Sequence, residues 1–330
     1  MISFILLLTI FLLSLLNGIQ DTVKGIATLW GSKKMSFYNA RLWSLLFVTL
    51  GSIASLYVAD TLVSHFQFRE LVPDAIGSQL SFYIAIALSS VITLVIATKF
   101  GFPVATTHAL IGGIIGVSFV SAGVDVNWGY LIGIFLLPLF LSPILSILTG
   151  WFLYAIWRKL MPKSFKRFSR VRYPSQTWHE HSVIMLHIMS AAWVSFNRGL
   201  NDTPKFIGLL VALNLSSKQY HMSIWAIVIS LFIGGFFGSK QTARTMAKFI
   251  TKLKPYRGLI ASLNTGAILF FANLLALPVS MTHIMVGSIY GVGFRRKRTS
   301  HKMMLKIGLA WILTMPLAAV MGALIYVIVQ

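Results

Sequence analysis

Two short stretches of this sequence repeat a carboxylate and a lysine at the same spacing, each time inside an apolar run. They are residues 17–24 and 198–205, which share Gly18, Asp21, Thr22 and Lys24 with Gly199, Asp202, Thr203 and Lys205. The chain has only seven acidic residues, so two of them in one repeated motif indicate function. A buried carboxylate is costly unless it meets a cation. Each aspartate should therefore meet Na⁺, a proton or the lysine three residues on, which shares its face in a helix.

A second repeat places hydroxyl groups after a proline. Residues 103–108 read Pro-Val-Ala-Thr-Thr-His, and residues 278–283 read Pro-Val-Ser-Met-Thr-His. Proline suits the first turn of a helix, and the free N–H groups and positive dipole end of a helix start attract anions. Two facing helix starts would suit a tetrahedral oxyanion such as phosphate, with added hydroxyl donors from Thr106, Thr107, Ser280 and Thr282.

The composition shows which solvent surrounds these groups. The chain has 330 residues, is 57% hydrophobic and 11% charged, and has a mean hydropathy of +0.81. Soluble domains carry roughly 25% charged residues, so this is a membrane protein with several spans. The net charge of +21 lies in short basic clusters between apolar runs, which fits membrane topology better than nucleic-acid binding. The chain has no cysteine. Residues 1–16 are expected to form a first helix rather than a removable signal.

The apolar runs predict ten membrane crossings, five on each side of a basic linker. They lie at roughly 2–30, 40–59, 81–98, 104–121 and 129–157, and then at 183–215, 221–239, 258–276, 279–294 and 307–328. The linker 158–181 and the loops 240–257 and 295–306 are basic, whereas the loops 60–80 and 122–128 are acidic. The positive-inside rule then puts the basic segments in the cytoplasm and both termini outside, in a plasma (inner) membrane. Some runs can instead be re-entrant hairpins, which would change the count.

Five crossings per half is an odd number, so the second half must be inserted upside down relative to the first. The expected fold is an all-α polytopic membrane protein of two inverted-topology repeats, residues 1–157 and 182–330, joined by the cytoplasmic linker 158–181. Each repeat has about five membrane elements, with broken helices or re-entrant segments that meet near the midplane. This pattern is typical of secondary transporters, whose binding site lies where the breaks meet.

The motifs resemble those of the inorganic phosphate transporter (PiT) family, in which Gly-x-Asn-Asp and Pro-Val-Ser-Thr-Thr-His occur in both halves. Residues 199–202 match the first motif fully, and residues 18–21 differ by Gln20. The resemblance covers essentially the whole chain and implies symport of inorganic phosphate with Na⁺ or H⁺ by an inverted-repeat homodimer, without a cofactor. The implied coupling-ion residues are Asp21, Gln20, Asp202 and Asn201, and the implied anion ligands are Thr106, Thr107, Ser280 and Thr282, with Asn201 beside them.

Two lysines distinguish this chain from the family pattern. Many members carry asparagine three residues after the aspartate, where this chain has Lys24 and Lys205. A fixed ammonium would repel Na⁺ at Asp21 or Asp202, and a buried lysine can also lose its proton. We therefore expect proton coupling, or a lysine that replaces one bound cation. We expect Lys205 to be a further anion ligand. Arg198 could bind the anion with two N–H groups or lie in a vestibule. Sulfate is the closest competing substrate.

Other interpretations of these residues remain open. The Asp–Lys pairs could be structural ion pairs that hold broken helices together, and His108 and His283 could pack or cap a helix rather than relay protons. An anion channel would use the same polar groups, although two interrupted inverted repeats favour alternating access. A membrane enzyme is disfavoured because the core motifs contain no cysteine and no histidine pair at metal-ligand spacing.

Overall fold

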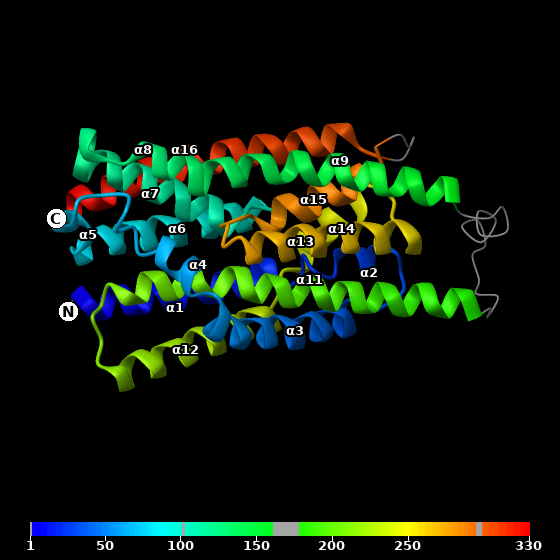
Figure 1. Cartoon of the computed structure of the whole chain (residues 1–330), viewed down its shortest axis with the longest axis horizontal. Coiled ribbons are helices and arrows are strands. Elements are labelled where there is room, and N and C mark those ends of the chain that lie inside the picture. Colours follow the sequence, from blue (N-terminus) through cyan, green and yellow to red (C-terminus); the bar gives the residue numbers. More distant parts are fainter. Residues whose placement is uncertain (1, 101–102, 161–177, 295–298) are drawn as a thin grey trace.

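The computed structural model describes residues 2–100, 103–160, 178–294 and 299–330, and the regular elements of these ranges are helices (Figure 1). The first half contains α1 (Ile2–Asp21), α2 (Ala27–Gly31), α3 (Phe37–Val58), α4 (Asp60–His65), α5 (Asp74–Gly77), α6 (Leu80–Phe100), α7 (Thr106–Ala122), η1 (Gly123–Asp125), α8 (Trp128–Tyr130), the π-helix η2 (Leu131–Leu136) and α9 (Leu137–Leu160). The second contains α11 (Trp178–Val211), α12 (Ser217–Phe236), α13 (Lys240–Arg244), the π-helix η3 (Thr245–Ile250), α14 (Pro255–Leu274), α15 (Met281–Gly291) and α16 (His301–Val329).

The outer surface is apolar over much of its area. Phe152 of α9, Phe271 of α14 and Leu313 of α16 are 56%, 61% and 67% exposed. Large apolar patches of this kind suit contact with lipid tails rather than water. Seven helical segments of the described residues are also long and apolar enough to cross a membrane. The expected all-α, multi-pass integral membrane protein is confirmed.

The chain runs back and forth along one long axis, and both termini lie at the same end (Figure 1). The short helices α5 and α8, which belong to the acidic segments, lie at this end. The end of α9 and the start of α11, which border the basic linker, lie at the opposite end. Most of the predicted linker 158–181 and part of the basic loop 295–306 fall outside the described residues. The separation of acidic from basic segments agrees with the predicted topology.

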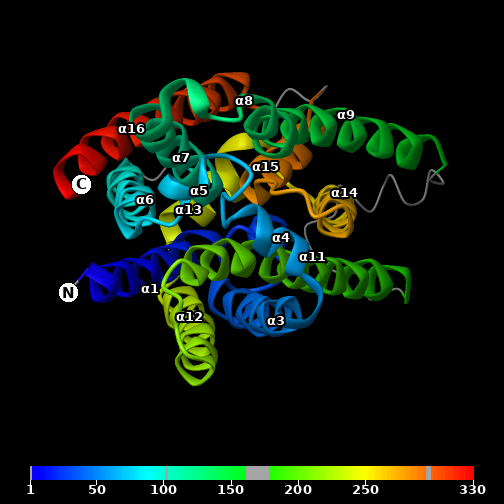
Figure 2. The same cartoon turned by 60° about the vertical axis from the view of Figure 1, so that its left-hand side comes forward.

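Two pairs of helices turn back inside the molecule instead of crossing it. Helix α6 starts at the end that holds the termini and α7 returns to it, whereas α14 starts toward the opposite end and α15 returns there (Figures 1 and 2). With 11 residues, α15 is about 16 Å long and too short for a bilayer of about 30 Å. The prediction of ten crossings is therefore wrong, and the alternative with re-entrant hairpins is correct. The count was too high because hydropathy does not distinguish a membrane span from a hairpin arm. The hairpins enter from opposite ends, as inverted repeats predict.

Polar side chains satisfy the backbone at the tips of these hairpins. Lys24 Nζ donates to the carbonyl of Val104 at 2.6 Å, and Trp311 Nε1 donates to the carbonyl of Pro103 at 2.9 Å. Non-helical backbone is tolerated at membrane depth only where protein or a wet cavity supplies such partners. Both contacts lie at the tip of the α6–α7 hairpin, so its chain can turn at Pro103 in the interior.

Helices of the two halves pack crosswise. Helix α1 packs against α12 and α11 against α3, while the hairpin helices α7 and α15 pack against α16 and α9. A Cβ on Gly18 would collide with the backbone of Leu231, and one on Gly199 would collide with that of Val48. Small residues permit such close helix contacts in membranes. The repeated glycine therefore makes the equivalent contact in each half.

Replacing Gly116 of α7 with alanine should lower the free energy of unfolding by about 2–3 kcal/mol, because overpacked methyl groups force the backbone to shift. Its Cβ would overlap the carbonyl group of Ala319 in α16. Thermal unfolding of the purified protein measures this loss. Gly308→Ala is the matched control, since a Cβ there meets nothing within 4 Å. Equal losses for the two variants would contradict the close contact of α7 with α16.

Candidate functional site

The charged residues of the two repeated stretches lie together in the interior. Asp21 and Lys24 lie at and just after the end of α1, and Arg198, Asp202 and Lys205 lie in α11. The two aspartates are 4% exposed and the three cations are 0% exposed. Three cations face two carboxylates, so these five groups carry one positive charge in excess. The excess favours an anion as their missing partner.

Only the first stretch interrupts its helix. Helix α1 ends at Asp21 and α2 begins at Ala27, whereas α11 continues through Pro204. The expectation of a break in each copy is therefore wrong for the second. Helix α11 continues past Pro204 at the cost of the backbone hydrogen bond that proline cannot donate.

Each lysine joins the aspartate of its own stretch to a helix start in the opposite hairpin. Lys24 pairs with Asp21 and donates to Thr282 Oγ1, at the start of α15, at 2.6 Å. Lys205 Nζ lies 2.7 Å from Asp202 Oδ1 and donates to Thr107 Oγ1, at the start of α7, at 2.9 Å. The predicted pairing of aspartate and lysine is thus present in both copies. The same contact made from each half agrees with a twofold pseudo-symmetry about the site.

Arg198 joins the two halves at the centre of this arrangement. Its Nε donates to Asp202 Oδ2 at 3.0 Å, and its terminal N–H groups donate to Asn17 Oδ1 at 2.7 Å and to Thr22 Oγ1 at 2.9 Å. Asn17 in turn donates from Nδ2 to Asp21 Oδ2 at 3.2 Å. Arg198 therefore lies in the buried centre and not in a vestibule.

Sequence reasoning did not select Asn17 and Thr22 as site residues. Asn17 holds the position in the first stretch that Arg198 holds in the second, and Thr22 is one of the four repeated residues. These alignments were the signal that could have identified them. Asn17 also donates to Thr106 Oγ1 at 3.0 Å, so it links the centre to the start of α7.

The hydroxyl groups divide into two kinds. Thr106, Thr107 and Thr282 each contact a side chain of the buried centre. Ser280 instead caps α15, where its Oγ accepts a hydrogen bond from the backbone N–H of His283 at 3.3 Å. Such a cap satisfies a free N–H at the helix start. The structure therefore brings Thr107 and Thr282 to the lysines and Thr106 to Asn17, and it uses Ser280 to cap the helix.

The two predicted amides bind the hairpin arms. Gln20 Nε2 donates to the carbonyl of Leu94 in α6 at 3.0 Å. Asn201 Nδ2 donates to Asn273 Oδ1 in α14 at 3.0 Å and lies 3.4 Å from the carbonyl of Leu277. These contacts attach each repeated stretch to the hairpin of its own half. A role of either amide in ion binding stays a prediction.

The two motif histidines pack against each other in the interior. Their rings are 4.3 Å apart between centroids, and the ring of His283 lies 3.9 Å from that of Trp311 in α16. His283 Nδ1 lies 3.3 Å from the carbonyl of Leu139 in α9. Both histidines are 1% exposed. This geometry favours a packing role over proton relay.

Replacing His283 with alanine should therefore cost about 3 kcal/mol of stability, as for other large buried rings, and leave the proton dependence of activity unchanged. Thermal unfolding and activity under a pH gradient measure the two effects. The exposed His221 provides the control, and His221→Ala should be nearly neutral. A stable His283→Ala protein that no longer responds to the pH gradient would instead favour the relay.

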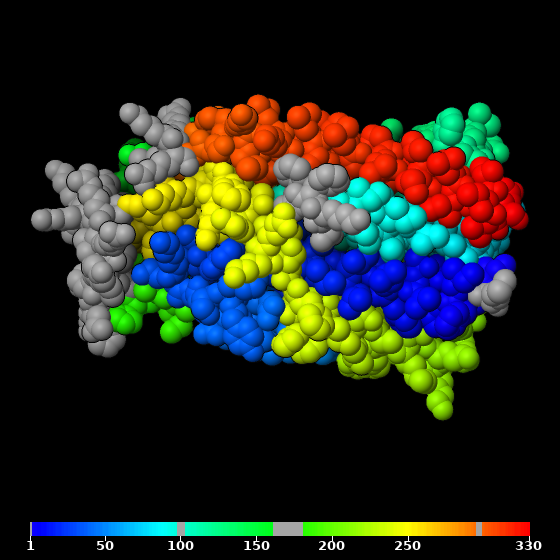
Figure 3. All heavy atoms as spheres, turned by 180° about the vertical axis from the view of Figure 1, so that it is seen from behind, coloured from blue at the N-terminus to red at the C-terminus, as the bar shows by residue number. Residues whose placement is uncertain are grey.

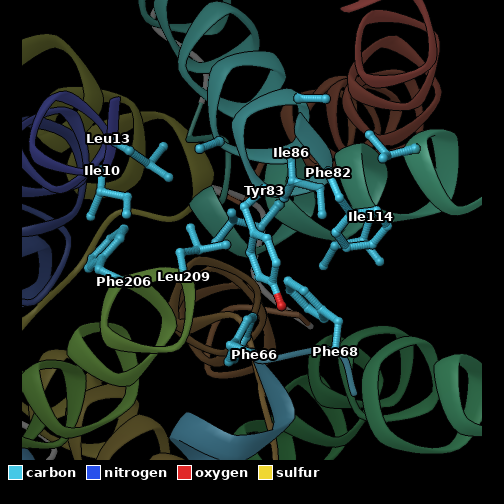
Figure 4. Packing of buried hydrophobic residues seen from close by; sticks show 14 of the residues in the cluster. Ile10, Leu13, Phe66, Phe68, Phe82, Tyr83, Ile86, Ile114, Phe206 and Leu209 are labelled. Atoms are coloured by element: carbon cyan, nitrogen blue, oxygen red, sulfur yellow. The ribbon is translucent and has the colours of Figure 1, made fainter. Parts of the chain in front are cut away.

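An apolar cluster adjoins the charged centre in the sequence of α11, where Phe206 follows Lys205. It is built from α4 and the loop after it, the start of α6, and α11 beyond Lys205, as Figure 4 shows for Phe66, Phe68, Tyr83 and Phe206. These rings are 0–3% exposed. The charged centre is sealed from solvent in this conformation, so a ligand can reach it only after the helices move.

Fold and site together define a class of protein: a polytopic helical membrane protein with a buried ionic centre between two re-entrant hairpins. The chain belongs to the phosphate transporter family, whose model matches residues 17–322. The resemblance to the inorganic phosphate transporters is therefore confirmed over nearly the whole chain.

The descriptions of similar proteins agree with this assignment. The chain is 28% identical to a "Probable low-affinity inorganic phosphate transporter" of Bacillus subtilis, over 96% of this chain and 93% of the relative. A protein of the same description from Rhizobium meliloti is 29% identical, over 94% and 91%. A solved structure described as "The sodium-dependent phosphate transporter" has a TM-score of 0.82 over 99% of this chain and 98% of that chain, at 21% identity, which shows a shared fold. These relatives are transporters, which places this chain among transporters rather than enzymes.

Proposed function

We propose that this protein carries inorganic phosphate across the plasma membrane by alternating access, coupled to a cation. The observation that carries the proposal is the pair of crosswise contacts, Lys24 to Thr282 and Lys205 to Thr107. Each contact sets an ammonium beside a hydroxyl, and charge-assisted hydrogen bonds of this kind suit phosphate oxygens. The excess positive charge and the names of the relatives support the same substrate.

In the proposed cycle, phosphate inserts between each lysine and its threonine. The ammonium groups would donate to phosphate oxygens, and the hydroxyls of Thr107 and Thr282 would change from acceptors to donors. Binding would thereby loosen the direct contacts that hold the hairpin tips to the centre. One hairpin could then move while the other stays, which opens the site to one end at a time.

The lysines also bear on the coupling ion. Each ammonium takes the place beside a carboxylate that Na⁺ would need, so we propose coupling to protons, or a lysine in place of one bound cation. In proteoliposomes, uptake of labelled phosphate should rise with an imposed pH gradient and persist without Na⁺. Uptake that requires Na⁺ and ignores the pH gradient would refute this coupling, while leaving phosphate transport intact.

Competition in the same proteoliposomes tests the substrate. Unlabelled phosphate should suppress uptake of the label, and sulfate at the same concentration should suppress it much less. If labelled sulfate enters faster than labelled phosphate, the protein is a sulfate permease of the same fold. Unsaturable flux that no gradient drives would indicate an anion channel instead.

We further propose that the basic segments face the cytoplasm and that the protein forms a homodimer. The chain has no cysteine, so single cysteines report sidedness directly. Val124→Cys, at a site that is 94% exposed beside Asp125, should react with a membrane-impermeant maleimide on intact cells. Lys302→Cys should react only after lysis. The reverse pattern would overturn the orientation, and chemical crosslinking in membranes tests the dimer.

A further inference from the structure

A basic hollow of about 370 Å³ lies on the surface between the two halves. One wall is the turn between α2 and α3, and the other is the π-helix η3; the hollow is lined by Trp30, Lys33, Lys34, Met35, Ser36 and Lys248. Figure 3 shows these two segments, blue and yellow, side by side on this face. Gly31 touches the backbone of Ala247, so the walls are in direct contact. None of the lining residues belongs to the buried centre.

Among the described residues, the three lysines of this hollow form no salt bridge with a carboxylate. None of the seven acidic residues lies in either wall, and the salt bridges of the described residues all belong to the buried centre. Lys248 Nζ lies 4.8 Å from the ring centroid of Trp30, which holds that ammonium over the hollow. Like charges gathered without counterions create a positive potential that attracts an anion from outside the chain.

The hollow also provides a hydroxyl donor. Ser36 Oγ accepts a hydrogen bond from the backbone N–H of Asn39 at 3.1 Å and so caps α3. Its own O–H can still donate to a ligand. Lys33 has a φ of 61°, a backbone conformation that favours glycine, and backbone strain of this kind collects at ligand sites. Three ammonium groups and a hydroxyl around one hollow match a phosphate group, which needs several donors and charge neutralisation.

We propose that this hollow is a second phosphate-binding site, separate from the transport centre, that takes either the headgroup of an anionic phospholipid or free phosphate. A phosphate group bound there contacts both the α2–α3 turn of the first half and η3 of the second. The bound phosphate group therefore links two segments that belong to different repeats. Basic surfaces beside a membrane attract anionic lipids for the same electrostatic reason.

Rates of lysine acylation test the site in the full-length protein. Purified protein in nanodiscs of phosphatidylcholine is labelled with an amine-reactive reagent, and peptide mass spectrometry gives the rate at each lysine. One arm adds phosphatidic acid to the nanodisc, and the other adds inorganic phosphate. When the ligand is near ten times its dissociation constant, labelling of Lys33, Lys34 and Lys248 should slow about tenfold. The exposed lysines Lys159, Lys252 and Lys302 are internal controls, because none of them lines the hollow.

The arms distinguish the two sources of the phosphate group. Selective slowing with phosphatidic acid alone assigns a lipid headgroup, and selective slowing with inorganic phosphate alone assigns the free ion. The phosphate arm is repeated with Lys24→Asn/Lys205→Asn in Na⁺-free buffer. That variant leaves two carboxylates and one cation in the buried centre, so protection cannot come from an anion bound there. No selective slowing in either arm, or equal slowing at the control lysines, overturns the proposal. In addition, Lys33→Gln/Lys34→Gln/Lys248→Gln should lose bound phosphatidic acid by native mass spectrometry, whereas Lys159→Gln/Lys252→Gln/Lys302→Gln should keep it.

Discussion

Replacing Asp202 with asparagine should abolish phosphate uptake and destabilise the protein by about 3–5 kcal/mol, the usual cost of leaving a buried charge uncompensated. Asp202 accepts hydrogen bonds from two buried cations, from Arg198 at 3.0 Å and from Lys205 at 2.7 Å. Both cations are 0% exposed, so water cannot replace the lost carboxylate. Uptake of labelled phosphate into proteoliposomes and thermal unfolding in detergent measure the two effects.

A second substitution separates stability from transport in this experiment. In Asp202→Asn/Lys205→Met, one uncompensated cation is gone, so part of the lost stability should return while uptake remains absent. Asp21→Asn is the comparison in the other half. It should cost less stability than Asp202→Asn, because Asp21 pairs with Lys24 alone whereas Asp202 pairs with two cations. If the single and double variants are equally unstable, the lysine and the aspartate are not coupled.

Replacing both lysines with asparagine should make phosphate uptake dependent on Na⁺. Lys24→Asn/Lys205→Asn removes two positive charges from a centre that has one in excess, and leaves two carboxylates beside neutral oxygen donors. Two bound Na⁺ ions would restore the original charge. A Na⁺ gradient should then accelerate uptake at least about tenfold, which corresponds to 1.4 kcal/mol, while the unmodified protein responds little. Initial uptake rates with Na⁺ or with choline as the external cation measure the difference.

The matched control makes the same lysine-to-asparagine substitution at two positions outside the buried centre. Lys159→Asn/Lys302→Asn replaces two exposed lysines and should behave like the unmodified protein. If Lys24→Asn/Lys205→Asn still carries phosphate but remains indifferent to Na⁺, the lysines do not stand in for a coupling cation. Their role would then be to bind the anion or to hold the helices.

Particular residues show how far sequence reasoning reached. The lysine was one of three partners that it proposed for each aspartate, beside Na⁺ and a proton, and both buried ion pairs are present. Asp202 and Lys205 share a helix face, as their spacing predicts, whereas Lys24 lies beyond the end of α1. Asn17 was not selected, although it binds Arg198, Asp21 and Thr106. Its alignment with Arg198 was the signal in the sequence, but the two residue types differ, so the repeat did not mark the position. The role of Asn17 became clear only from its contacts with the second stretch and with the start of α7.

The number of crossings shows a second limit. Residues 81–98 and 104–121 are as apolar as true spans, yet they form the two arms of one hairpin. Hydropathy shows which residues avoid water, but it does not show whether the chain turns back at Pro103. The contact of Lys24 with the carbonyl of Val104 makes that turn possible, and it joins residues far apart in the sequence.

The sequence by itself determined that this chain lies in a membrane and that it consists of helices. It also showed one acidic motif and one hydroxyl motif, each present in two copies, that carry the chemistry. These properties follow from composition and from local spacing, which do not depend on how distant segments meet. Only the tertiary structure decided that each lysine reaches the hairpin of the opposite half, that Ser280 caps a helix, and that Gln20 and Asn201 anchor hairpin arms. The physical reason is that many partners would satisfy the same local sequence pattern. The packing of one half against the other selects which partner each buried polar group meets.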